Sequence, residues 1–461
     1  MKIVVCVRQG TDGLINPFDA CAYEAALSIN NAEVILLSMG PASTQPFLTE
    51  MTRLGASRAI LLSDPQFAGS DTLATAYILA LAVGELQPDL VICGRQTLVG
   101  DTGQVGPMLS ALLLYPLIAN VMRVVSTEGE LVCETRSQGM QTAAYPALMT
   151  IERINRLRLP SIRSKTKSVE IWDHVRLSAQ PERCGLHGSP TRVLETYQND
   201  AGRRKCRFIE PSELETTIAE ARQKDRHPVV ASIQNRQGLK NVWIIGEEPR
   251  EMASSVSDDI CLIPRDTAEH LAQRIREGRP SAVLWASDAW SKSTAAQTAA
   301  LLQIGLCADC TALETDGATL FMYRPAFSGS LIAKIRCLTT PAMATVRTTQ
   351  KDDSDVVLAV GYGARNHFSA LEKWGSAIGA AMASSRKAVD NDLMPYDTQV
   401  GLTGKTLAPA VYIAVGVSGA VHHLVGMRNA GTVIAINPDK DAPIFEYADY
   451  GIVAEVESVI S

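Results

Sequence analysis

The sequence predicts an α/β protein built on parallel sheets, and three observations lead to this prediction. Short apolar runs, such as residues 2–7 (KIVVCV) and 32–38 (AEVILLS), end in glycine, proline or polar turns. Segments with helical apolar spacing, such as residues 71–86, separate these runs. The runs are continuous rather than alternating, which is typical of strands that are buried on both faces of a parallel sheet.

The same strand and helix rhythm occurs three times along the 461 residues. We expect a first domain at 1–195, a second, shortened domain at 241–350 and a third at 351–461. A polar segment at 196–240 separates the first two and is expected to be an arm and linker. A chain of this length has room for two to four domains, each with its own core.

The first two domains also resemble each other in sequence. Residues 109–121 (LSALLLYPLIANV) and 298–310 (TAALLQIGLCADC) each place a helix before a strand that starts with Leu-(Ile/Cys)-Ala. Each is followed by a glycine turn, an alternating segment and a Pro-Ala strand start. This repetition predicts two α/β domains related by a pseudo-twofold axis, with the third domain as an addition.

Composition restricts the class of protein. Hydrophobic residues make up 46% of the chain, charged residues 20%, and the net charge is −6. The chain therefore lacks the basic surface typical of nucleic-acid binding, so no nucleic-acid partner is expected. The apolar runs are too short to cross a bilayer and the N-terminus does not look like a signal peptide, so a cytoplasmic protein that is not membrane-embedded is expected.

Cysteine usage indicates no metal site. The ten cysteines are scattered, and several lie inside expected strands, as reduced buried thiols do. Cys307 and Cys310 form a single CxxC without a second pair, which is weak evidence for metal or redox chemistry. We therefore expect no metal.

A phosphate site is expected within residues 399–427. A P-loop does not fit, because Gln399 stands where its first glycine would be, and the turn 416–419 does not follow the dinucleotide-binding pattern. An apolar strand nevertheless enters a glycine and serine turn, and a helix follows. Unpaired N–H groups at a helix start favour an anion. A glycine turn used only for tight packing remains the alternative.

Several longer strings resemble electron-transfer flavoproteins, with a β-subunit-like half followed by an α-subunit-like half in one chain. In the first half they are INPFDACAYEAAL (15–27), CGRQTLVGDTGQVGP (93–107) and GSPTRV (188–193). In the second half they include RPAFSGSLIAKI (324–335), SSRKAVD (384–390), QVGLTGKT (399–406) and VGVSGAVHHLVGM (415–427). The resemblance spans nearly the full length and implies that the third domain is a doubly wound FAD-binding domain.

The resemblance also implies the residues of the FAD site. Thr403 would offer its hydroxyl to the flavin N5, Arg386 would lie against the ring, and His423 would sit near C2=O and counter negative charge on an anionic semiquinone. Taken alone, these residues read as a turn hydroxyl, a helix-end cation and a core histidine. The other expected contacts are Ser385, Val400, Gly401, Leu402, Ser418, Gly419, Ala420, Val421, His422 and Asn437.

The β-subunit-like half is expected to hold a second nucleotide, either AMP or a second FAD. Small residues and hydrogen-bond donors in its loop would let the backbone approach a diphosphate. The loop sequence favours the two-FAD, bifurcating members of the family, and an empty loop is the alternative. The expected contacts are Cys6, Asn16, Pro17, Phe18, Asp19, Met39, Gly94, Gly100, Asp101, Thr102, Gly103, Gln104 and Val105.

The implied function is FAD-mediated electron transfer. The donor would be a flavin-dependent dehydrogenase, recognised by residues 154–167 with Ile162 as the apolar anchor, and the acceptor a quinone reductase or another redox protein. A first alternative is an NADH-dependent, electron-bifurcating flavoprotein with two FAD. A second is an adenine-nucleotide-binding scaffold without redox function.

The sequence departs from the family in several places. The glycine-rich turn after the first strand of the third domain reads VGYGAR (360–365), Leu402 replaces a glutamine and Pro438 replaces a lysine. The second domain is expected to lack a helix after NVWIIGE (241–247). The altered turn and the loss of two polar side chains would weaken FAD binding.

Overall fold

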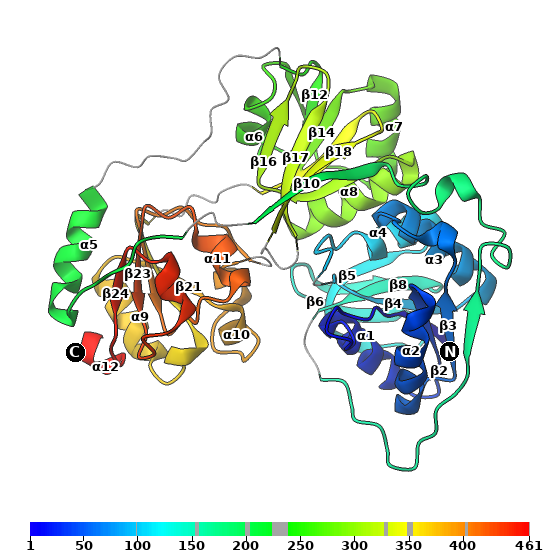
Figure 1. The fold of residues 1–461 in the computed structure, drawn as a ribbon, viewed down its shortest axis with the longest axis horizontal. Helices are drawn as coiled ribbons and strands as arrows, with labels where there is room; N and C mark the ends of the chain where they lie inside the picture. The colour runs from blue at the N-terminus through cyan, green and yellow to red at the C-terminus, as the bar shows by residue number, and fades with distance from the viewer. Residues whose placement is uncertain are drawn as a thin grey trace. The chain divides into compact units, whose positions relative to one another are not determined.

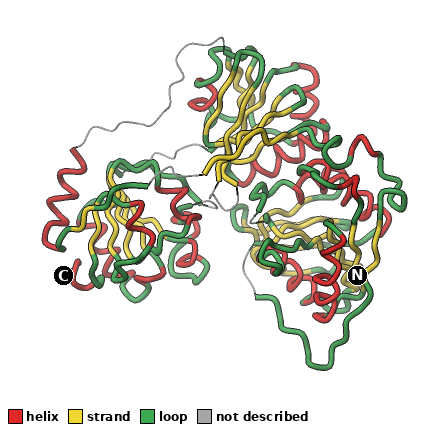
Figure 2. The backbone as a smooth tube through the Cα atoms, viewed as in Figure 1, coloured by secondary structure: helices red, strands yellow, loops and turns green. Residues whose placement is uncertain are grey.

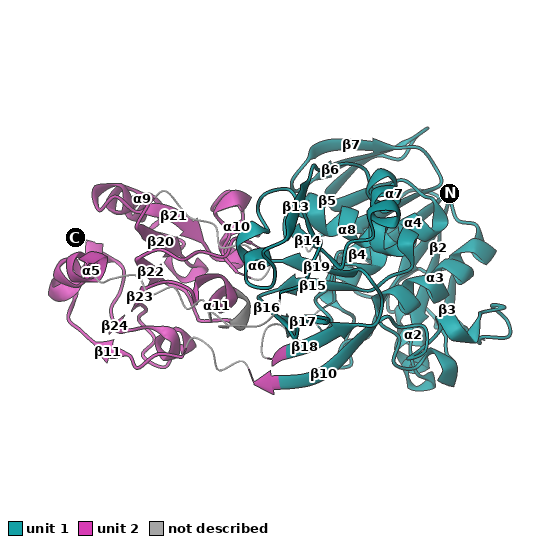
Figure 3. Cartoon of the chain, turned by 90° about the horizontal axis from the view of Figure 1, so that it is seen from above, with its two compact units in different colours: residues 1–196, 233–327, 333–347 teal, residues 197–232, 328–332, 348–461 magenta. Residues whose placement is uncertain are grey.

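The computed structural model describes residues 1–97, 99–152, 156–198, 203–223, 238–326, 331–347, 354–401 and 404–460, without the side chains of Val421 and His422. The chain forms two compact units (Figure 3). Unit 1 contains residues 1–196, 233–327 and 333–347, and unit 2 contains residues 197–232, 328–332 and 348–461. Within the described ranges, no helix combines the length and apolar character needed to cross a membrane.

The first half of unit 1 is built on a nine-stranded sheet in the order β7-β6-β5-β8-β4-β1-β2-β3-β9 (Figure 1). Seven strands run parallel, and the edge hairpin of β6 and β7 is antiparallel. The strands are β1 (Lys2–Cys6), β2 (Glu33–Met39), β3 (Arg58–Leu62), β4 (Leu90–Gly94), β5 (Leu117–Ser126), β6 (Leu131–Thr135), β7 (Gly139–Ala143), β8 (Ala147–Ile151) and β9 (Val169–Trp172).

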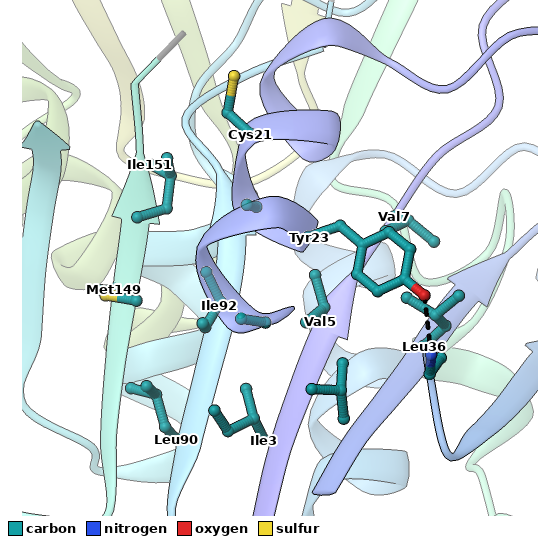
Figure 4. Close-up of a cluster of buried hydrophobic side chains, with 14 of the residues drawn as sticks. Ile3, Val5, Val7, Cys21, Tyr23, Leu36, Leu90, Ile92, Met149 and Ile151 are labelled. Carbon is teal, nitrogen blue, oxygen red and sulfur yellow. Dashed lines mark hydrogen bonds between the residues drawn. The ribbon is translucent and has the colours of Figure 1, made fainter. Parts of the chain in front are cut away.

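Helices cover both faces of this sheet. They are α1 (Pro17–Leu27), α2 (Gln45–Met51), α3 (Thr72–Leu86) and α4 (Val105–Leu113). One core lies under α1 and α2, and the other lies under α3 and α4. Figure 4 shows the first of these cores, in which the Tyr23 hydroxyl accepts a hydrogen bond from the Ala56 N–H at 3.0 Å. Burial on both faces explains why the strands read as continuous apolar runs.

The second half of unit 1 has a parallel five-stranded sheet in the order β13-β12-β14-β19-β15 and a four-stranded sheet in the order β10-β18-β17-β16. The strands are β10 (Thr191–Gln198), β12 (Val242–Ile245), β13 (Ile260–Ile263), β14 (Ala282–Ala286), β15 (Leu306–Cys310), β16 (Ala312–Thr315), β17 (Leu320–Ala326), β18 (Leu331–Cys337) and β19 (Ala342–Val346). The helices are α6 (Arg250–Ser254), α7 (Ala268–Gly278) and α8 (Ala289–Leu302).

Two details of this half differ from or extend the sequence expectations. The expectation that no helix follows residues 241–247 was wrong, because the short helix α6 begins at Arg250. The two halves also share a core, in which Leu73 and Met108 of the first half join Trp285 and Ala296 of the second. The halves are therefore parts of one packed unit.

Unit 2 is a doubly wound domain, as predicted. Its six strands run parallel in the order β11-β24-β23-β22-β20-β21. Figure 2 shows its strands in yellow with helices in red around them. They are β11 (Arg207–Phe208), β20 (Val356–Val360), β21 (Ala381–Ser384), β22 (Val411–Val415), β23 (Thr432–Ile436) and β24 (Tyr450–Ile452). The helices are α5 (Leu214–Gln223), α9 (Phe368–Ala377), α10 (Arg386–Val389), α11 (Val421–Met427) and α12 (Glu457–Ile460).

Two separate cores lie on the two faces of this sheet. Side chains of α5, α9 and α12 pack on one face, and side chains of α11 and residues 442–448 pack on the other. Part of the segment expected to be an arm and linker thus takes part in unit 2, since β11 extends its sheet and α5 covers it.

Candidate nucleotide sites

The order of the strands places a candidate site in unit 2. From β20 the chain goes to β21 on one side and then to β22 on the other, so the direction of winding reverses between β20 and β22. Open α/β sheets bind ligands at the carboxyl ends of the strands beside such a point. Three expected contact segments lie at these ends: Ser385 after β21, residues 416–420 after β22 and Asn437 after β23.

The altered turn after β20 packs closely on the turn after β22. The Gly361 N–H donates to the Val415 carbonyl at 2.8 Å, and the Gly363 N–H donates to the Gly416 carbonyl at 3.1 Å. A Cβ at Gly361 would lie 2.1 Å from the Gly416 oxygen, so only glycine fits there. The Arg365 guanidinium stacks on the Tyr362 ring, 5.2 Å from its centroid. The VGYGAR sequence therefore still forms a tight turn at the strand ends.

Residues 399–401 join the site through backbone contacts. The Val400 N–H donates to the Ser384 carbonyl at 2.9 Å, and the Gly401 N–H donates to the Lys405 carbonyl at 3.1 Å. Gly426 of α11 lies so close that a Cβ there would be 2.3 Å from the Gly401 nitrogen. Val400 and Gly401 are therefore held between the end of β21 and α11, whereas Leu402 and Thr403 lie outside the described residues.

Ser385 and Arg386 begin the helix that follows β21. The Ser385 hydroxyl is buried and has no hydrogen-bond partner among the described residues. Arg386 is the first residue of α10, and its Nε donates to the Asp390 carboxylate at 3.2 Å. The arginine thus has an ion-pair partner within its own segment, and a contact with flavin would have to share or replace it.

His423 is buried and has one hydrogen bond. Its side chain lies in α11 at 5% exposure, and its Nε2 is 2.9 Å from the Tyr412 hydroxyl of β22. Its Nδ1 has no partner in the described part of the chain. Burial lowers the pKa of His423 to about 4, so the imidazole is neutral at physiological pH. It can therefore offer a hydrogen bond but not a full positive charge.

The turn before α11 is fixed by neighbouring backbone and by Asn437. Gly419 has a φ of 87°, and a Cβ there would lie 2.2 Å from the Ile444 nitrogen. The Asn437 amide donates to the Val417 carbonyl at 3.0 Å, and its oxygen accepts from the Asp439 N–H at 3.0 Å. The amide N–H of Asn437 thus joins the ends of β22 and β23, and its oxygen closes the turn that follows β23. Ser418 and Ala420 are exposed beside this turn, and Val421 and His422 begin α11.

The first half of unit 1 has a reversal of its own between β1 and β4. Cys6 and Cys93 are paired neighbours near the ends of these strands, and Met39 ends β2. The Asn16 amide donates to the Gln96 carbonyl at 2.9 Å, while its oxygen is buried without a partner among the described residues. The Ser38 hydroxyl is likewise buried and unpartnered within those residues.

Gly94 lets the end of β4 touch the start of α1. A Cβ at Gly94 would lie 2.2 Å from Asp19 Oδ1 and 2.7 Å from the Phe18 carbonyl carbon. Asp19 is buried next to Pro17 and Phe18 in the first turn of α1, and its carboxylate accepts from the Arg8 N–H at 2.8 Å. Burial raises the pKa of Asp19 to about 7.

The loop between β4 and α4 is held at both ends. The Asp101 N–H donates to the Thr97 carbonyl at 2.9 Å, and Asp101 and Gly103 adopt positive φ angles of 50° and 64°. Gln104 accepts from the Thr72 hydroxyl at 2.9 Å and donates to the Leu306 carbonyl at 3.3 Å. Gly100 and Thr102 line the partly exposed stretch between these anchors, and Val105 begins α4.

Comparison with known proteins decides the family. A model described as "Electron transfer flavoprotein domain" matches residues 3–176 and 258–355, and one described as "Electron transfer flavoprotein FAD-binding domain" matches residues 351–428. The chain belongs to the electron transfer flavoprotein family. The resemblance stated from the sequence is confirmed, with β-like and α-like parts in one chain.

Each of the following relatives is a single protein or subunit that aligns with less than half of this chain. Protein FixA of Azorhizobium caulinodans is 38% identical over 228 residues, which are 45% of this chain and 81% of FixA. The electron transfer flavoprotein subunit alpha of Thermoanaerobacterium thermosaccharolyticum is 33% identical over 239 residues, 42% of this chain and 72% of the subunit. The caffeyl-CoA reductase-Etf complex subunit CarD of Acetobacterium woodii is 35% identical over 213 residues, 43% of this chain and 81% of CarD.

The structure adds site residues that the sequence reasoning missed. Tyr412 contacts His423, and Ser38 presents an unpartnered hydroxyl at the end of β2. A tyrosine within the apolar strand VYIAV was the available signal for Tyr412, because a buried tyrosine hydroxyl needs a partner. The expected partner anchor, Ile162, is fully exposed in the segment after residue 155, next to the equally apolar and exposed Leu159.

Proposed function

We propose that this electron transfer flavoprotein is a single-chain electron carrier with FAD in unit 2. The observation that carries the proposal is a pair of buried polar atoms, Ser385 Oγ and His423 Nδ1, that lack partners in the described residues. Buried polar groups in native proteins are rarely left unbonded. Both residues belong to the segment that matches the FAD-binding domain, at the switch point where α/β sheets bind ligands.

Bound FAD would supply reversible redox chemistry, and the protein would supply orientation and electrostatics. Ser385 and His423 would offer hydrogen bonds, the glycine turn at 416–419 would let the diphosphate approach the backbone, and Val400 and Gly401 would cover the ring. Because His423 is neutral, its contribution would be an N–H dipole rather than a positive charge. Arg386 would supply the positive charge.

We further propose that the first half of unit 1 holds a second adenine nucleotide, AMP or FAD. Two buried atoms there have no partner among the described residues and could bond to a ligand. Asn16 Oδ1 could accept a hydrogen bond, and the Ser38 hydroxyl could donate or accept one. The loop between β4 and α4 turns through the positive φ angles of Asp101 and Gly103, and the lack of a side chain at Gly100 and Gly103 would let a diphosphate approach its backbone. Asp19 lies beneath this site in contact with Gly94.

The electron donor would be a flavin-dependent dehydrogenase and the acceptor a quinone reductase or another redox protein. A small exposed apolar anchor with charged neighbours suits a transient interface. Ile162 and Leu159 are such anchors, with Arg163 and Lys165 beside them. Replacing Ile162 with serine is expected to weaken reduction by the donor without changing FAD content.

An electron-bifurcating function with two FAD is the second candidate. It is favoured by the first-half loop and by the similarity to CarD, which is named as a subunit of a caffeyl-CoA reductase-Etf complex. The test is anaerobic titration of the purified chain with NADH. Bleaching of flavin absorbance would favour bifurcation, and reduction only by a dehydrogenase or by dithionite would favour the simple carrier.

The primary test of the proposal is FAD affinity in Ser385→Ala and its matched control Ser376→Ala. Ser376 lies exposed in α9, and its hydroxyl bonds to its own helix at Glu372. Loss of one ligand hydrogen bond is expected to weaken FAD binding by about 3- to 10-fold in Ser385→Ala. Equal FAD affinity in both variants would contradict the proposed site, and a chain that takes up no FAD would favour the scaffold without redox function.

A further inference from the structure

Tyr412 and His423 form an isolated buried pair in unit 2. Tyr412 is the second residue of β22 and is at 0% exposure, and its hydroxyl is 2.9 Å from His423 Nε2. The rings meet edge to face, with centroids 6.2 Å apart and planes at 62°. Tyr412 belongs to the core under α11, and His423 is buried beside it at 5% exposure.

The proton in this hydrogen bond has two possible positions. If His423 carried its proton on Nε2 and donated it to Tyr412, the Tyr412 O–H would need a second acceptor. No such acceptor is present among the described residues, and a buried donor without a partner costs about 1–3 kcal/mol. The bare Nδ1 would be unpartnered as well. This arrangement leaves two polar groups unsatisfied.

The opposite position of the proton leaves only one polar group of the pair unsatisfied. The neutral Tyr412 hydroxyl donates to Nε2, and the imidazole proton then resides on Nδ1. Tyr412 remains neutral, since burial raises the pKa of its hydroxyl well above the usual value. The only unsatisfied group of the pair within the described chain is then the Nδ1–H, which a ligand acceptor can satisfy.

We propose that Tyr412 is a positioning residue that fixes His423 as the neutral Nδ1–H tautomer, so that its free N–H is directed to an acceptor on the bound cofactor. The inference rests on the proposed FAD site and deepens it by naming the residue that sets the donor. A phenylalanine at this position would fill the same space but would leave Nε2 free to take the proton.

The test is the protonation of the two ring nitrogens of His423, measured by ¹⁵N NMR on the full chain as purified. The chain has seven histidines, so selective ¹⁵N-histidine labelling and a His423→Asn variant assign the signal. The expected result is a protonated Nδ1 and an unprotonated Nε2. In Tyr412→Phe the two nitrogens are expected to give averaged signals from both tautomers.

Tyr447→Phe is the matched control, because Tyr447 packs on the same core and the substitution also removes one tyrosine hydroxyl. It should leave the His423 signals unchanged. FAD affinity is expected to fall about 3- to 10-fold in Tyr412→Phe and to stay unchanged in the control. A protonated Nε2 in the unmodified protein, or an unchanged tautomer in Tyr412→Phe, would overturn the inference.

The NMR measurement tests the role of Tyr412, and the FAD measurement tests the proposed function, so either claim can be refuted without the other. A fixed Nδ1–H tautomer in a chain that takes up no FAD would refute the proposed function while retaining the role of Tyr412. Normal FAD binding with protonated Nε2 would retain the function and refute the inference. Because the tautomer of the unmodified protein is measured without Tyr412→Phe, the test holds even if that variant does not fold.

Discussion

The two halves of unit 1 share a framework but differ at the edge where a nucleotide would bind. In the first half, residues 95–104 separate the end of β4 from the start of α4. In the second half, only Ser287 and Asp288 separate β14 from α8, and Asp288 caps the helix directly through the Ser291 N–H. The room for a ligand loop therefore exists only in the first half.

Corresponding positions in the two halves have the same backbone conformation but side chains of different charge. Asn120 and Asp309 both have a positive φ, 58° and 56°, and the N–H of each donates to a threonine hydroxyl of the adjacent strand. Glu152 follows β8, whereas Arg347 follows β19 in the corresponding place. Strand geometry is thus retained while the polar residues at the strand ends diverge.

The charge change gives the halves different electrostatics. In the first half, Glu152 forms ion pairs with Arg95 at 2.7 Å and Arg136 at 3.1 Å. In the second half, Asp309 pairs with Lys292 at 2.8 Å and Arg347 at 3.6 Å.

Arg324 of the second half is buried as well, and its charge also acts on Asp309. Burial would raise the pKa of Asp309, but the charges of Lys292 and Arg347 outweigh it and hold that pKa below its usual value. The first-half cluster thus has two cations for one carboxylate, and the second-half cluster has three.

The largest effect is expected from removing the balancing charge of the first half. Glu152→Gln leaves Arg95 and Arg136 without their shared carboxylate and should cost about 3–5 kcal/mol of unfolding free energy. Glu134→Gln, which breaks the exposed pair with Arg123, should cost less than about 1 kcal/mol. Guanidinium unfolding in a Trp374→Phe background reports unit 1, because the other four tryptophans belong to it. Equal costs would contradict the importance of the buried Glu152 pairs for the stability of the first half.

Asp19 lies only under the first-half site and predicts a dependence on pH. Because its pKa is about 7 when folded and 3.8 as a free side chain, the folded protein holds the proton more tightly. Stability therefore falls as pH rises from about 4 to 7 and stays lower above that range. Asp19→Asn should be more stable than the parent at pH 8, by up to about 4 kcal/mol, and the gain should vanish near pH 4. A constant difference across this range would contradict the burial of an ionisable Asp19.

Gly94→Ala converts the end of β4 to the residue found at the end of β14, Ala286. The new Cβ would overlap Asp19 and the start of α1, so a loss of about 3 kcal/mol and of nucleotide from unit 1 is expected. Gly84→Ala is the matched control, because nothing lies within 4 Å of a Cβ there. In the last turn of α3 it should stabilise by up to about 0.5–1 kcal/mol. Hydrogen exchange in α1 and α3 measures both changes.

The smallest expected effect has opposite signs in the two halves. Arg324→Met removes a buried cation, one of the three that face the single Asp309 carboxylate, and should stabilise unit 1 by about 1–2 kcal/mol. Arg136→Met removes a partner of Glu152 and should destabilise it by a similar amount. Thermal unfolding of the two variants side by side gives the signs, and destabilisation by both would mean that Arg324 has a structural role equal to that of Arg136.

The fold could be predicted well from the sequence because local sequence patterns specify most of its helices and strands. Continuous apolar strands, helical spacing and the internal repeat led to parallel sheets and to a doubly wound third domain. Helix α6 was missed because a single helical turn, Arg250–Ser254, has too little periodicity to detect. The strands β16 to β18 form a separate small sheet with the distant strand β10, and no local signal specifies which strands pair across such distances.

The sequence predicted which segments form the candidate sites, but it did not predict the hydrogen-bond partners of their side chains. Residues 385, 419 and 423 were named, and the fold places their segments at strand ends around one point. That Asn437 is consumed by internal hydrogen bonds, and that Tyr412 holds His423, depends on contacts between elements. Burial makes His423 neutral, which its sequence neighbours could not indicate.

The most direct test of the whole account is the nucleotide content of the purified chain. Denaturation releases bound nucleotides, which chromatography then quantifies per chain. The account predicts one FAD from unit 2 together with one further adenine nucleotide, AMP or FAD, from the first half of unit 1. No FAD after incubation with excess cofactor would contradict the central claim.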